Sequence, residues 1–196
     1  MNIYTEWKQK IDVEAAVAVG EINTRRLISE EYIRMNARLH QANESYGTSG
    51  RNYADDVLKV HSIVQAVSIL DYGSGKGTLK ASLPQGLDVR EYDPAIPLIA
   101  MHPEPADLVV CTDVMEHIEP DYLAEVLEDI HSLAVKGVYL TVATRPAKKF
   151  LEDGRNAHLI VEPATWWISK INACFNDSKG GGYQFDQKHL MVWLVK

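Results

Sequence analysis

The distribution of apolar residues divides the chain into segments of two kinds. A continuous apolar run is typical of a parallel strand covered on both faces, and it predicts a strand at 107–112. Strands are also expected at 67–72, 89–92 and 138–143. Apolar residues at helical spacing predict helices over 53–67, 78–83, 120–133 and 163–175. This alternation of strands and helices predicts an α/β protein with a doubly wound, mostly parallel sheet.

Several residues mark where these elements end. Pro84 ends the helix at 78–83, because proline cannot continue a helix and disfavours helical geometry in the residue before it. Gly137 is expected to end the helix that begins at Pro120. Near the end of the chain, a turn at 186–188 separates two short apolar segments that predict strands at 183–185 and 190–195.

The N-terminal quarter differs from the rest of the chain. Residues 5–42 have a helical pattern, with Ile28, Tyr32, Met35 and Leu39 on one face. The stretch 45–50 then breaks the pattern with glycine and hydroxyl residues. We expect residues 1–50 to form a helical cap and residues 51–196 to form the main domain.

A glycine-rich stretch directly follows the first predicted strand. It contains Asp71, Gly73, Gly75 and Gly77, spaced two residues apart. A phosphate-binding P-loop needs Ser or Thr after Gly-Lys, and here Gly77 follows. A dinucleotide fingerprint would put its third small residue at Thr78. The pattern Asp-x-Gly-x-Gly-x-Gly instead resembles motif I of the class I S-adenosylmethionine (SAM) methyltransferases.

A second stretch carries the same resemblance. The strand at 107–112 leads into Asp113-Val-Met-Glu-His117, which is similar to the D-V-x-E-H signature of a broad methyltransferase group that includes the ubiquinone-pathway O-methyltransferases. The resemblance covers roughly residues 53–196. It implies SAM as cofactor, a C-terminal antiparallel hairpin, and a segment before motif I that covers the site.

The resemblance also implies a set of cofactor-binding residues. Asp93 ends the second predicted strand, 22 residues after Asp71, where this fold places the carboxylate that accepts both ribose hydroxyls. The full expected set is Asp71, Gly73, Ser74, Gly75, Gly77, Tyr92, Asp93, Thr112, Asp113 and Val114.

The segment between the second and fourth strands of the expected fold is short. Only 13 residues separate Asp93 from Asp107, and four of them are prolines. A helix and a strand do not both fit there. We therefore predict a domain abridged between strands 2 and 4, with the third strand missing or vestigial and the adenine contact unassigned.

Three residues are candidates for catalysis: Glu116, His117 and His158. His117 is the best candidate for a general base, because an unperturbed imidazole titrates near neutral pH and the residue follows the carboxyl end of a strand. A structural histidine that packs on the next helix is an equal alternative. His158 lies in the loop after the fifth strand, where the resembled group often has a histidine.

The same residues, with Asp113, also suggest a metal site. A similar acidic-x-x-Glu-His array with a later histidine binds a divalent metal in the small-RNA 2′-O-methyltransferases. The first position there is Glu and the surrounding sequence differs, so the interpretation without a metal is preferred. Chelation followed by elemental analysis would distinguish the two.

A basic loop in an acidic chain bears on the methyl acceptor. Arg145, Lys148, Lys149 and Arg155 lie within 11 residues after the fifth strand. A solvated loop is one explanation, and an acidic acceptor such as a carboxylate or a sugar phosphate is the other. The candidate substrate-binding residues are Arg145, Arg155, Asn156 and Trp166.

Composition limits the remaining possibilities. The net charge of −7 and a pI near 5.5 disfavour general nucleic-acid binding. No apolar run approaches the roughly 20 residues that span a bilayer, and the N-terminus lacks a basic stretch followed by an apolar core. The two cysteines form no CxxC pair and suit reduced thiols. We expect a cytoplasmic protein without a membrane partner, and the sequence does not predict an oligomeric state.

The sequence therefore predicts a SAM-dependent methyltransferase that acts at oxygen or nitrogen of a small or nucleotide-like acceptor. A non-catalytic SAM-binding sensor or partner subunit and a metal-dependent RNA 2′-O-methyltransferase remain as alternatives. A nicotinamide-dependent oxidoreductase is disfavoured by the glycine spacing.

Overall fold

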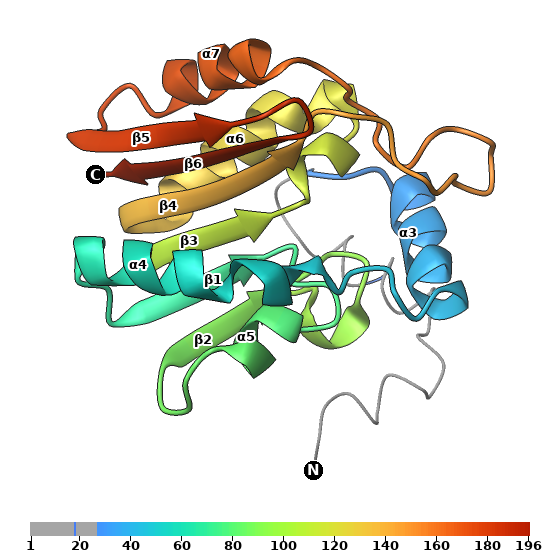
Figure 1. Cartoon of the computed structure of the whole chain (residues 1–196). Helices are drawn as coiled ribbons and strands as arrows, with labels where there is room; N and C mark the ends of the chain where they lie inside the picture. The colour runs from blue at the N-terminus through green and yellow to red at the C-terminus, as the bar shows by residue number, and fades with distance from the viewer. Residues whose placement is uncertain (1–17, 19–26) are drawn as a thin grey trace.

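The computed structural model describes Ala18 and residues 27–196, and its centre is one mixed β-sheet (Figure 1). In the described part, the sheet has six strands in the order β2-β1-β3-β4-β6-β5. Pairing is parallel from β2 to β4 and antiparallel at β4–β6 and β6–β5. The strands are β1 (Ser68–Tyr72), β2 (Asp88–Tyr92), β3 (Ala106–Thr112), β4 (Ala134–Ala143), β5 (Gly180–Phe185) and β6 (His189–Val195). The predicted α/β fold and its C-terminal antiparallel hairpin are confirmed.

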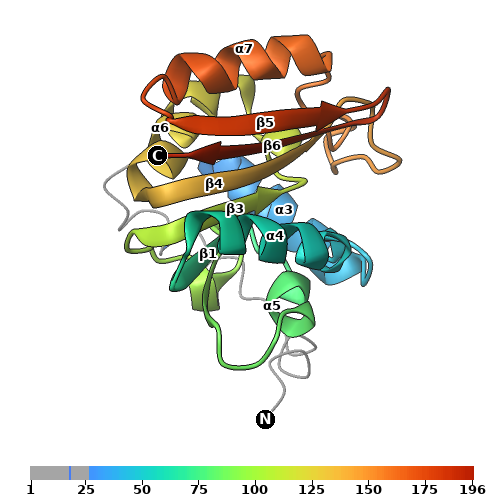
Figure 2. The same ribbon diagram turned by 60° about the vertical axis from the view of Figure 1, so that its left-hand side comes forward.

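Helices cover both faces of this sheet (Figure 2). On one face, α6 (Leu123–Leu133) and α7 (Ala164–Cys174) pack on Leu70, Val109 and Leu140. On the other face, α4 (Ala54–Val64) and α5 (Thr78–Ser82) pack on Ile69, Leu108 and Tyr139. Neighbouring strand residues point to opposite faces, so the continuous apolar runs feed two cores.

The segment between β2 and β3 forms no strand. Residues 93–105 are all described, and they contain one short 3₁₀ turn, η2 (Pro97–Ile99). The predicted loss of the third strand is therefore confirmed, and β2 is an edge of the sheet.

The N-terminal region contributes a helix beside the sheet. Helix α3 (Glu30–Ala42) starts after Ser29, whose hydroxyl accepts a hydrogen bond from the Tyr32 backbone N–H at 3.1 Å. The Ser29 hydroxyl and backbone N–H both donate to the Glu119 carboxylate, at 2.7 and 2.8 Å. The start of α3 is thereby tied to the segment that follows β3. The predicted helix over 5–29 lies outside the described residues, apart from Ala18 and residues 27–29.

One predicted helix boundary is wrong. Helix α6 ends at Leu133 and β4 begins at Ala134, so Gly137 lies inside a strand. A Cβ at this position would lie 2.6 Å from the Leu194 carbonyl oxygen and 2.9 Å from Val64 Cγ1. Glycine is needed here because β6 and α4 approach the backbone closely.

Short 3₁₀ turns complete the described elements: η1 (Ser49–Tyr53), η3 (Met115–His117) and η4 (Pro120–Tyr122). In the described part of the chain, no helix combines the length and the apolar character needed to cross a membrane.

Candidate active site

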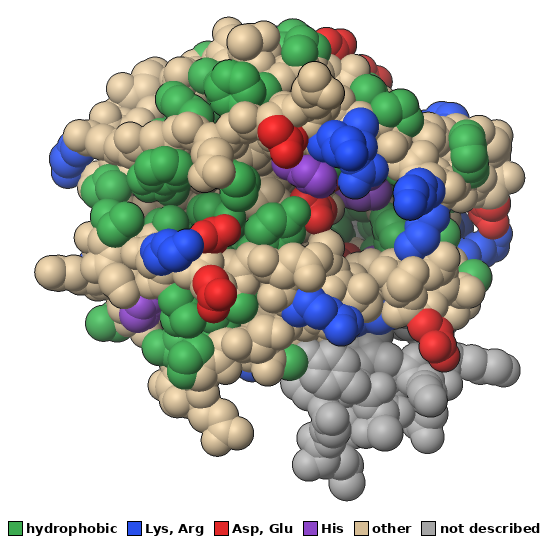
Figure 3. Space-filling view, in the orientation of Figure 1, with side chains coloured by type: hydrophobic (Ala, Val, Ile, Leu, Met, Phe, Trp, Pro, Cys, Tyr) green, Lys and Arg blue, Asp and Glu red, His purple; other side chains and the backbone are tan. Residues whose placement is uncertain are grey.

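A cavity opens at the carboxyl ends of β1 and β3. The chain leaves β1 toward β2 on one side and returns to β3 on the other, and such switch points are where doubly wound sheets bind ligands. The cavity has a volume of about 430 Å³, which suits a small-molecule site. Figure 3 shows this hollow, with Lys, Arg and His side chains gathered on its rim.

The glycine-rich turn forms the floor of the cavity. Gly73, Gly75 and Gly77 all have left-handed backbone angles, with φ of 77°, 52° and 65°. A Cβ at Gly73 would collide with Val114. The backbone N–H groups of Gly73 and Ser74 donate to the Tyr92 carbonyl oxygen at 2.7 and 3.0 Å. The turn is therefore held by the end of β2, and its backbone is exposed to the cavity at Gly73 and Gly75.

A second loop crosses this turn. The Gly47 carbonyl oxygen accepts a hydrogen bond from the Lys76 backbone N–H at 2.8 Å. A Cβ at Gly75 would lie 2.7 Å from the same oxygen, so the two loops are in direct backbone contact. Lys76 Nζ donates to the Asn43 carbonyl oxygen at 2.7 Å. These contacts hold the loop at 45–50 against the floor of the cavity.

Asp93 is buried at the edge of the cavity, with both carboxylate oxygens occupied. One oxygen accepts from the Gly75 backbone N–H and the other from the Ala95 backbone N–H, both at 3.0 Å. Burial raises the pKa of this carboxyl to about 6, although the two backbone hydrogen bonds oppose the rise. Each oxygen retains a lone pair for a further donor.

Asp71 is 2 % exposed and lines the cavity, and its buried Oδ2 has no hydrogen-bond partner. Burial raises its pKa to about 8, and the carboxylates of Glu91 and Asp93 add to the rise. Other residues that line the cavity also have buried polar atoms without a partner, among them His40 Nδ1, Ser74 Oγ and Glu116 Oε2. Unpaired buried polar groups are costly, so the lining is suited to a polar ligand.

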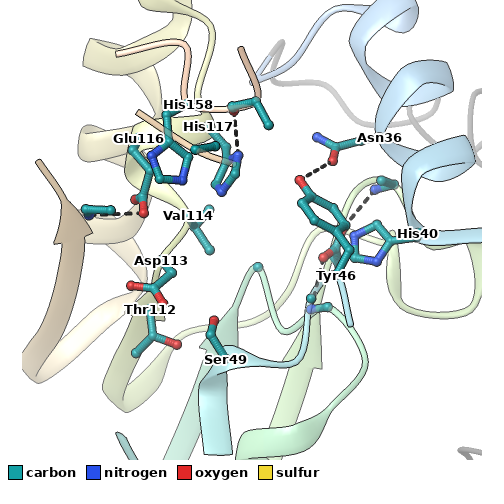
Figure 4. Close-up of a pocket in the computed structure, with 18 of the residues that line it drawn as sticks. Asn36, His40, Tyr46, Ser49, Thr112, Asp113, Val114, Glu116, His117 and His158 are labelled. Atoms are coloured by element: carbon teal, nitrogen blue, oxygen red, sulfur yellow. Dashed lines mark hydrogen bonds between the residues drawn. The ribbon is translucent and has the colours of Figure 1, made fainter. Parts of the chain in front are cut away.

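Glu116, His117 and His158 converge on one wall of the cavity (Figure 4). One atom from each of these side chains lies within 4.8 Å of the other two. Glu116 is fully buried, and its Oε1 accepts from the Ala143 backbone N–H at 3.0 Å. Burial and the nearby Asp113 raise the pKa of Glu116 to about 8.

The two histidines have the same hydrogen-bond arrangement. Nδ1 of His117 donates to the Ala157 carbonyl oxygen, and Nδ1 of His158 donates to the Arg145 carbonyl oxygen, both at 2.6 Å. Because a carbonyl oxygen only accepts, Nδ1 carries the proton in both rings. Burial lowers the pKa of His117 to about 4 and also lowers the pKa of His158. Both rings are therefore neutral near pH 7, and their Nε2 atoms carry lone pairs.

Asp113 lines the cavity but is held apart from this group. Its Oδ1 accepts from the Tyr53 hydroxyl at 2.8 Å and from the Thr141 hydroxyl at 3.0 Å. Its backbone is left-handed, with φ of 54°, which is uncommon outside glycine. The residue is a bridge between η1, β3 and β4.

Helix α3 and Ile28 before it supply the opposite wall. The resemblance implies a covering segment here, but the sequence interpretation did not name Asn36 or His40 as site residues. Ile28, Tyr32, Asn36 and His40 all line the cavity. Asn36 Oδ1 accepts from the Tyr46 hydroxyl at 2.8 Å, and the Tyr46 ring contacts His40 edge-on at 4.7 Å between centroids. The spacing of four residues from 28 to 40, with two polar members, was the available signal.

The other predicted site residues divide into two groups. Thr112, Val114 and Arg145 line the cavity, as do Asp71, Gly73, Ser74, Gly75, Asp93 and Asp113. Gly77 instead precedes α5, and Tyr92 is buried with its ring edge-on to Tyr72. Neither residue lines the cavity, and the Tyr92 carbonyl oxygen instead accepts hydrogen bonds from the glycine turn.

Three of the four predicted substrate residues lie outside the cavity. Arg155 is exposed and pairs with Asp153 at 2.6 Å. The Asn156 side chain exchanges two hydrogen bonds with the Ala147 backbone, at 2.9 and 3.0 Å. Trp166 lines a different cavity, between α6 and α7.

The rim is basic at the end of β4. Arg145, Lys148 and Lys149 line the cavity, and His189 was missed by the sequence interpretation. Lys149 Nζ lies 5.2 Å from the centroid of the Tyr46 ring, a cation–π contact between the rim and the crossing loop. The cavity thus has buried acidic groups on its floor and basic groups on its rim.

Known structures share this fold at low sequence identity. The DhpI complex with S-adenosylhomocysteine (SAH) has a TM-score of 0.56 and 15% identity, covering 85% of this chain and 97% of that chain. An O-methyltransferase family protein from Burkholderia thailandensis has a TM-score of 0.61 and 14% identity, covering 98% and 69%. The 1,6-didemethyltoxoflavin-N1-methyltransferase of Burkholderia thailandensis, with its substrate and SAH bound, has a TM-score of 0.52 and 15% identity, covering 95% and 90%.

No curated protein matches the sequence significantly. A family model described as a methyltransferase domain matches residues 24–193. This match covers most of the chain, and it confirms the predicted class and enzymatic activity. The family match also agrees with SAM as the cofactor, which the glycine motif had implied. The chain therefore belongs to the methyltransferase domain family.

Proposed function

We propose that this protein transfers a methyl group from SAM to an oxygen or nitrogen atom of a small or nucleotide-like acceptor. The observation that carries the proposal is the set of unpartnered buried polar atoms around an exposed glycine backbone, all on one cavity. Such a lining needs a polar ligand to satisfy it.

The residues present fit SAM. The backbone at Gly73 and Gly75 lines the cavity without a side chain to keep a ligand away, so SAM can approach it closely. Asp93 has acceptor capacity left for a pair of ribose hydroxyls. The unpartnered Oδ2 of Asp71 suits the ammonium group of the methionine part.

The wall formed by Glu116, His117 and His158 would then face the acceptor. SAM supplies an activated methyl group, so the protein needs to bind and align the acceptor and, for a hydroxyl, to remove a proton. Alignment is worth effective molarities on the order of 10⁵ M and upward. A neutral Nε2 of His158 or His117 can take this proton, although a pKa lowered to about 4 makes His117 a weak base. General-base catalysis contributes about 10² to 10⁴.

We extend the predicted cap to this site. Helix α3 and the loop at 45–50 line the cavity opposite the catalytic wall, and the Asn36–Tyr46 hydrogen bond joins them. In the proposal, the described part of the predicted cap, residues 27–50, encloses the acceptor and limits water access.

The basic rim favours an acidic acceptor. Arg145, Lys148 and Lys149 are positioned to pair with a carboxylate or phosphate. A charge-assisted hydrogen bond is worth about 1.5 to 3 kcal/mol, or roughly one to two factors of ten in affinity.

The test measures SAH production with matched acceptors that differ only in an acidic group. Suitable pairs are a phenol with a hydroxybenzoate and a nucleoside with its 5′-monophosphate. We expect turnover with the acidic members at a lower KM, and we expect Arg145→Glu to raise that KM by about tenfold or more. Arg155→Glu is the matched control, because Arg155 belongs to the same loop but lies outside the cavity.

Two results would contradict the proposal. SAH binding without turnover across the panel would favour a SAM-binding protein that lacks catalysis. Turnover with equal KM for acidic and neutral members would leave methyl transfer in place and remove the acidic acceptor. Titration of both variants with SAH should give wild-type affinity, which shows that the fold and the cofactor half are intact.

A further inference from the structure

We propose that Glu116, His117 and His158 form a binding site for one divalent transition-metal ion. The side chains come from two segments separated in sequence, η3 and the loop at 144–163, and they meet on one wall of the cavity (Figure 4). The inference rests on the geometry of this group. It does not depend on SAM or on the identity of the acceptor.

The orientation of the two imidazoles is the first support. Both rings donate Nδ1–H to a backbone carbonyl oxygen at 2.6 Å, which fixes the tautomer and leaves Nε2 as a lone-pair donor. Histidines that bind metals almost always have such a partner on the other ring nitrogen. The rings meet edge-on, with centroids 4.8 Å apart.

The Glu116 carboxylate is the second support. The residue is fully buried, and Oε1 is held by the Ala143 backbone N–H at 3.0 Å. Oε2 has no hydrogen-bond partner. A buried carboxylate oxygen without a partner is costly, and a bound cation would satisfy it. The held oxygen orients the other one, as supporting hydrogen bonds do for ligating carboxylates.

The distances require the site to close on the ion. One atom from each of the three side chains lies within 4.8 Å of the others. Ligands at about 2.1 Å from a tetrahedral ion lie about 3.4 Å from one another. Side-chain rotations that shorten the separations by up to about 1.4 Å would bring the three donors into range.

The donor set selects the class of metal. Two imidazoles and one carboxylate suit Zn²⁺, Fe²⁺, Co²⁺ or Mn²⁺, whereas Mg²⁺ and Ca²⁺ prefer oxygen ligands alone. Three protein ligands leave coordination positions open, as in catalytic metal sites. These positions would face the cavity, where oxygen atoms of an acceptor could occupy them.

The surrounding charges partly offset one another. Arg145 and Lys149 act on Glu116 and His117 respectively and oppose a cation, while Asp113 favours one. Asp113 itself is not a ligand in the proposal, because its Oδ1 already accepts two hydroxyl groups. The site is therefore smaller than the four-residue array that the sequence suggested.

The experiment uses the full chain, stripped with chelator and exchanged into metal-free buffer. Calorimetric titration with ZnCl₂ and, separately, MgCl₂ gives stoichiometry and affinity, and the visible absorption spectrum of added Co²⁺ reports coordination by nitrogen. We expect one Zn²⁺ per chain, much weaker Mg²⁺ binding, and a Co²⁺ spectrum that Zn²⁺ abolishes.

The variants are His158→Ala and Glu116→Gln, with His61→Ala as the matched control. Gln keeps an oxygen for the Ala143 N–H and replaces the unpartnered oxygen. Each of the two should weaken Zn²⁺ binding at least about tenfold. Removing a residue that only hydrogen-bonds to a metal ligand already lowers metal affinity by about tenfold or more, and these two residues are ligands in the proposal. His61 lies on α4 outside the cavity and should leave binding unchanged.

SAH affinity of each variant checks that the protein is folded. Absence of stoichiometric Zn²⁺ binding, or binding that both variants retain, would overturn the metal site. Either result would leave the proposed methyl transfer standing, which the SAH-production assay tests separately. A bound ion would instead occupy both Nε2 atoms, so neither histidine could then act as the base.

Discussion

Replacing Asp71 by Asn should stabilise the ligand-free protein and weaken cofactor binding. The carboxyl is 2 % exposed and its Oδ2 has no partner, so the ionised form loses hydration without gaining a hydrogen bond. Burial, then Glu91 and Asp93, raise its pKa from 3.8 to about 8, and only Lys80 opposes the rise. Asn is nearly isosteric and carries no charge.

Proton linkage determines how the free energy of unfolding changes with pH. The folded protein holds this proton more tightly than the unfolded chain, so the free energy of unfolding falls as pH rises from about 4 to about 8. Each pH unit in that window is worth about 1.4 kcal/mol, which gives an upper limit of about 6 kcal/mol. Water in the cavity reduces this penalty, and we expect Asn to gain about 2 kcal/mol at about pH 8 and almost nothing at about pH 5.

Urea denaturation of both proteins across this pH range measures the difference. Glu116 also has a raised pKa of about 8, but it is present in both proteins and largely cancels. Asp88→Asn is the control, because Asp88 begins β2 and is exposed. In calorimetry with SAH, the ratio of wild-type to variant affinity should grow with pH. A variant no more stable than wild type at about pH 8 would refute the argument that Asp71 ionises at a cost.

Two further substitutions test the floor of the cavity. Asp93→Asn places an amide donor against the backbone N–H of either Gly75 or Ala95, so it should cost about 1 to 3 kcal/mol in urea denaturation and also weaken SAH binding; stability within about 0.5 kcal/mol of wild type would contradict this. Gly75→Ala brings a Cβ to 2.7 Å from the Gly47 carbonyl oxygen at a φ of 52°, so it should lower the free energy of unfolding by more than about 2 kcal/mol. Gly86 is the control, because its φ is 96° and a Cβ there would meet open space. Gly86→Ala should therefore lose only the energy of the backbone strain. Equal losses for the two glycines would mean that the loop contact is unimportant.

The parts of the site that the sequence predicted are those set by local backbone requirements. The glycine turn needs left-handed angles at three positions, and Asp93 follows its strand directly. The two-sided burial of the strands made them continuous apolar runs. These features are determined by residues that are close together in the sequence, so a short stretch of sequence is enough to predict them.

The residues that were missed or misplaced depend on tertiary packing. Trp166 and Trp167 are adjacent on α7, yet Trp167 is fully buried while Trp166 lines the other cavity, because successive helical side chains point about 100° apart. Asn36 and His40 reach the site because contacts remote in sequence hold α3 there, among them the Ser29–Glu119 hydrogen bond and the packing of α3 on Leu151. Gly137 looks like a helix end in sequence, and its close neighbours, Leu194 and Val64, are remote in the chain.

The missing strand has a physical cause that also bears on the site. Four prolines among residues 94–106 lack the N–H that a strand would donate to β2, so the segment cannot extend the sheet. The exposed edge of β2 is instead short and charged, and Arg90 donates to the carbonyl oxygens of Glu104 and Pro105 at 3.3 and 2.8 Å. The tight return from β2 bonds the Asp93 backbone N–H to the Ile99 carbonyl oxygen at 3.0 Å. The abridged connection thereby fixes Asp93 beside the glycine turn, which favours a preformed position for the proposed ribose contact over one that forms on binding.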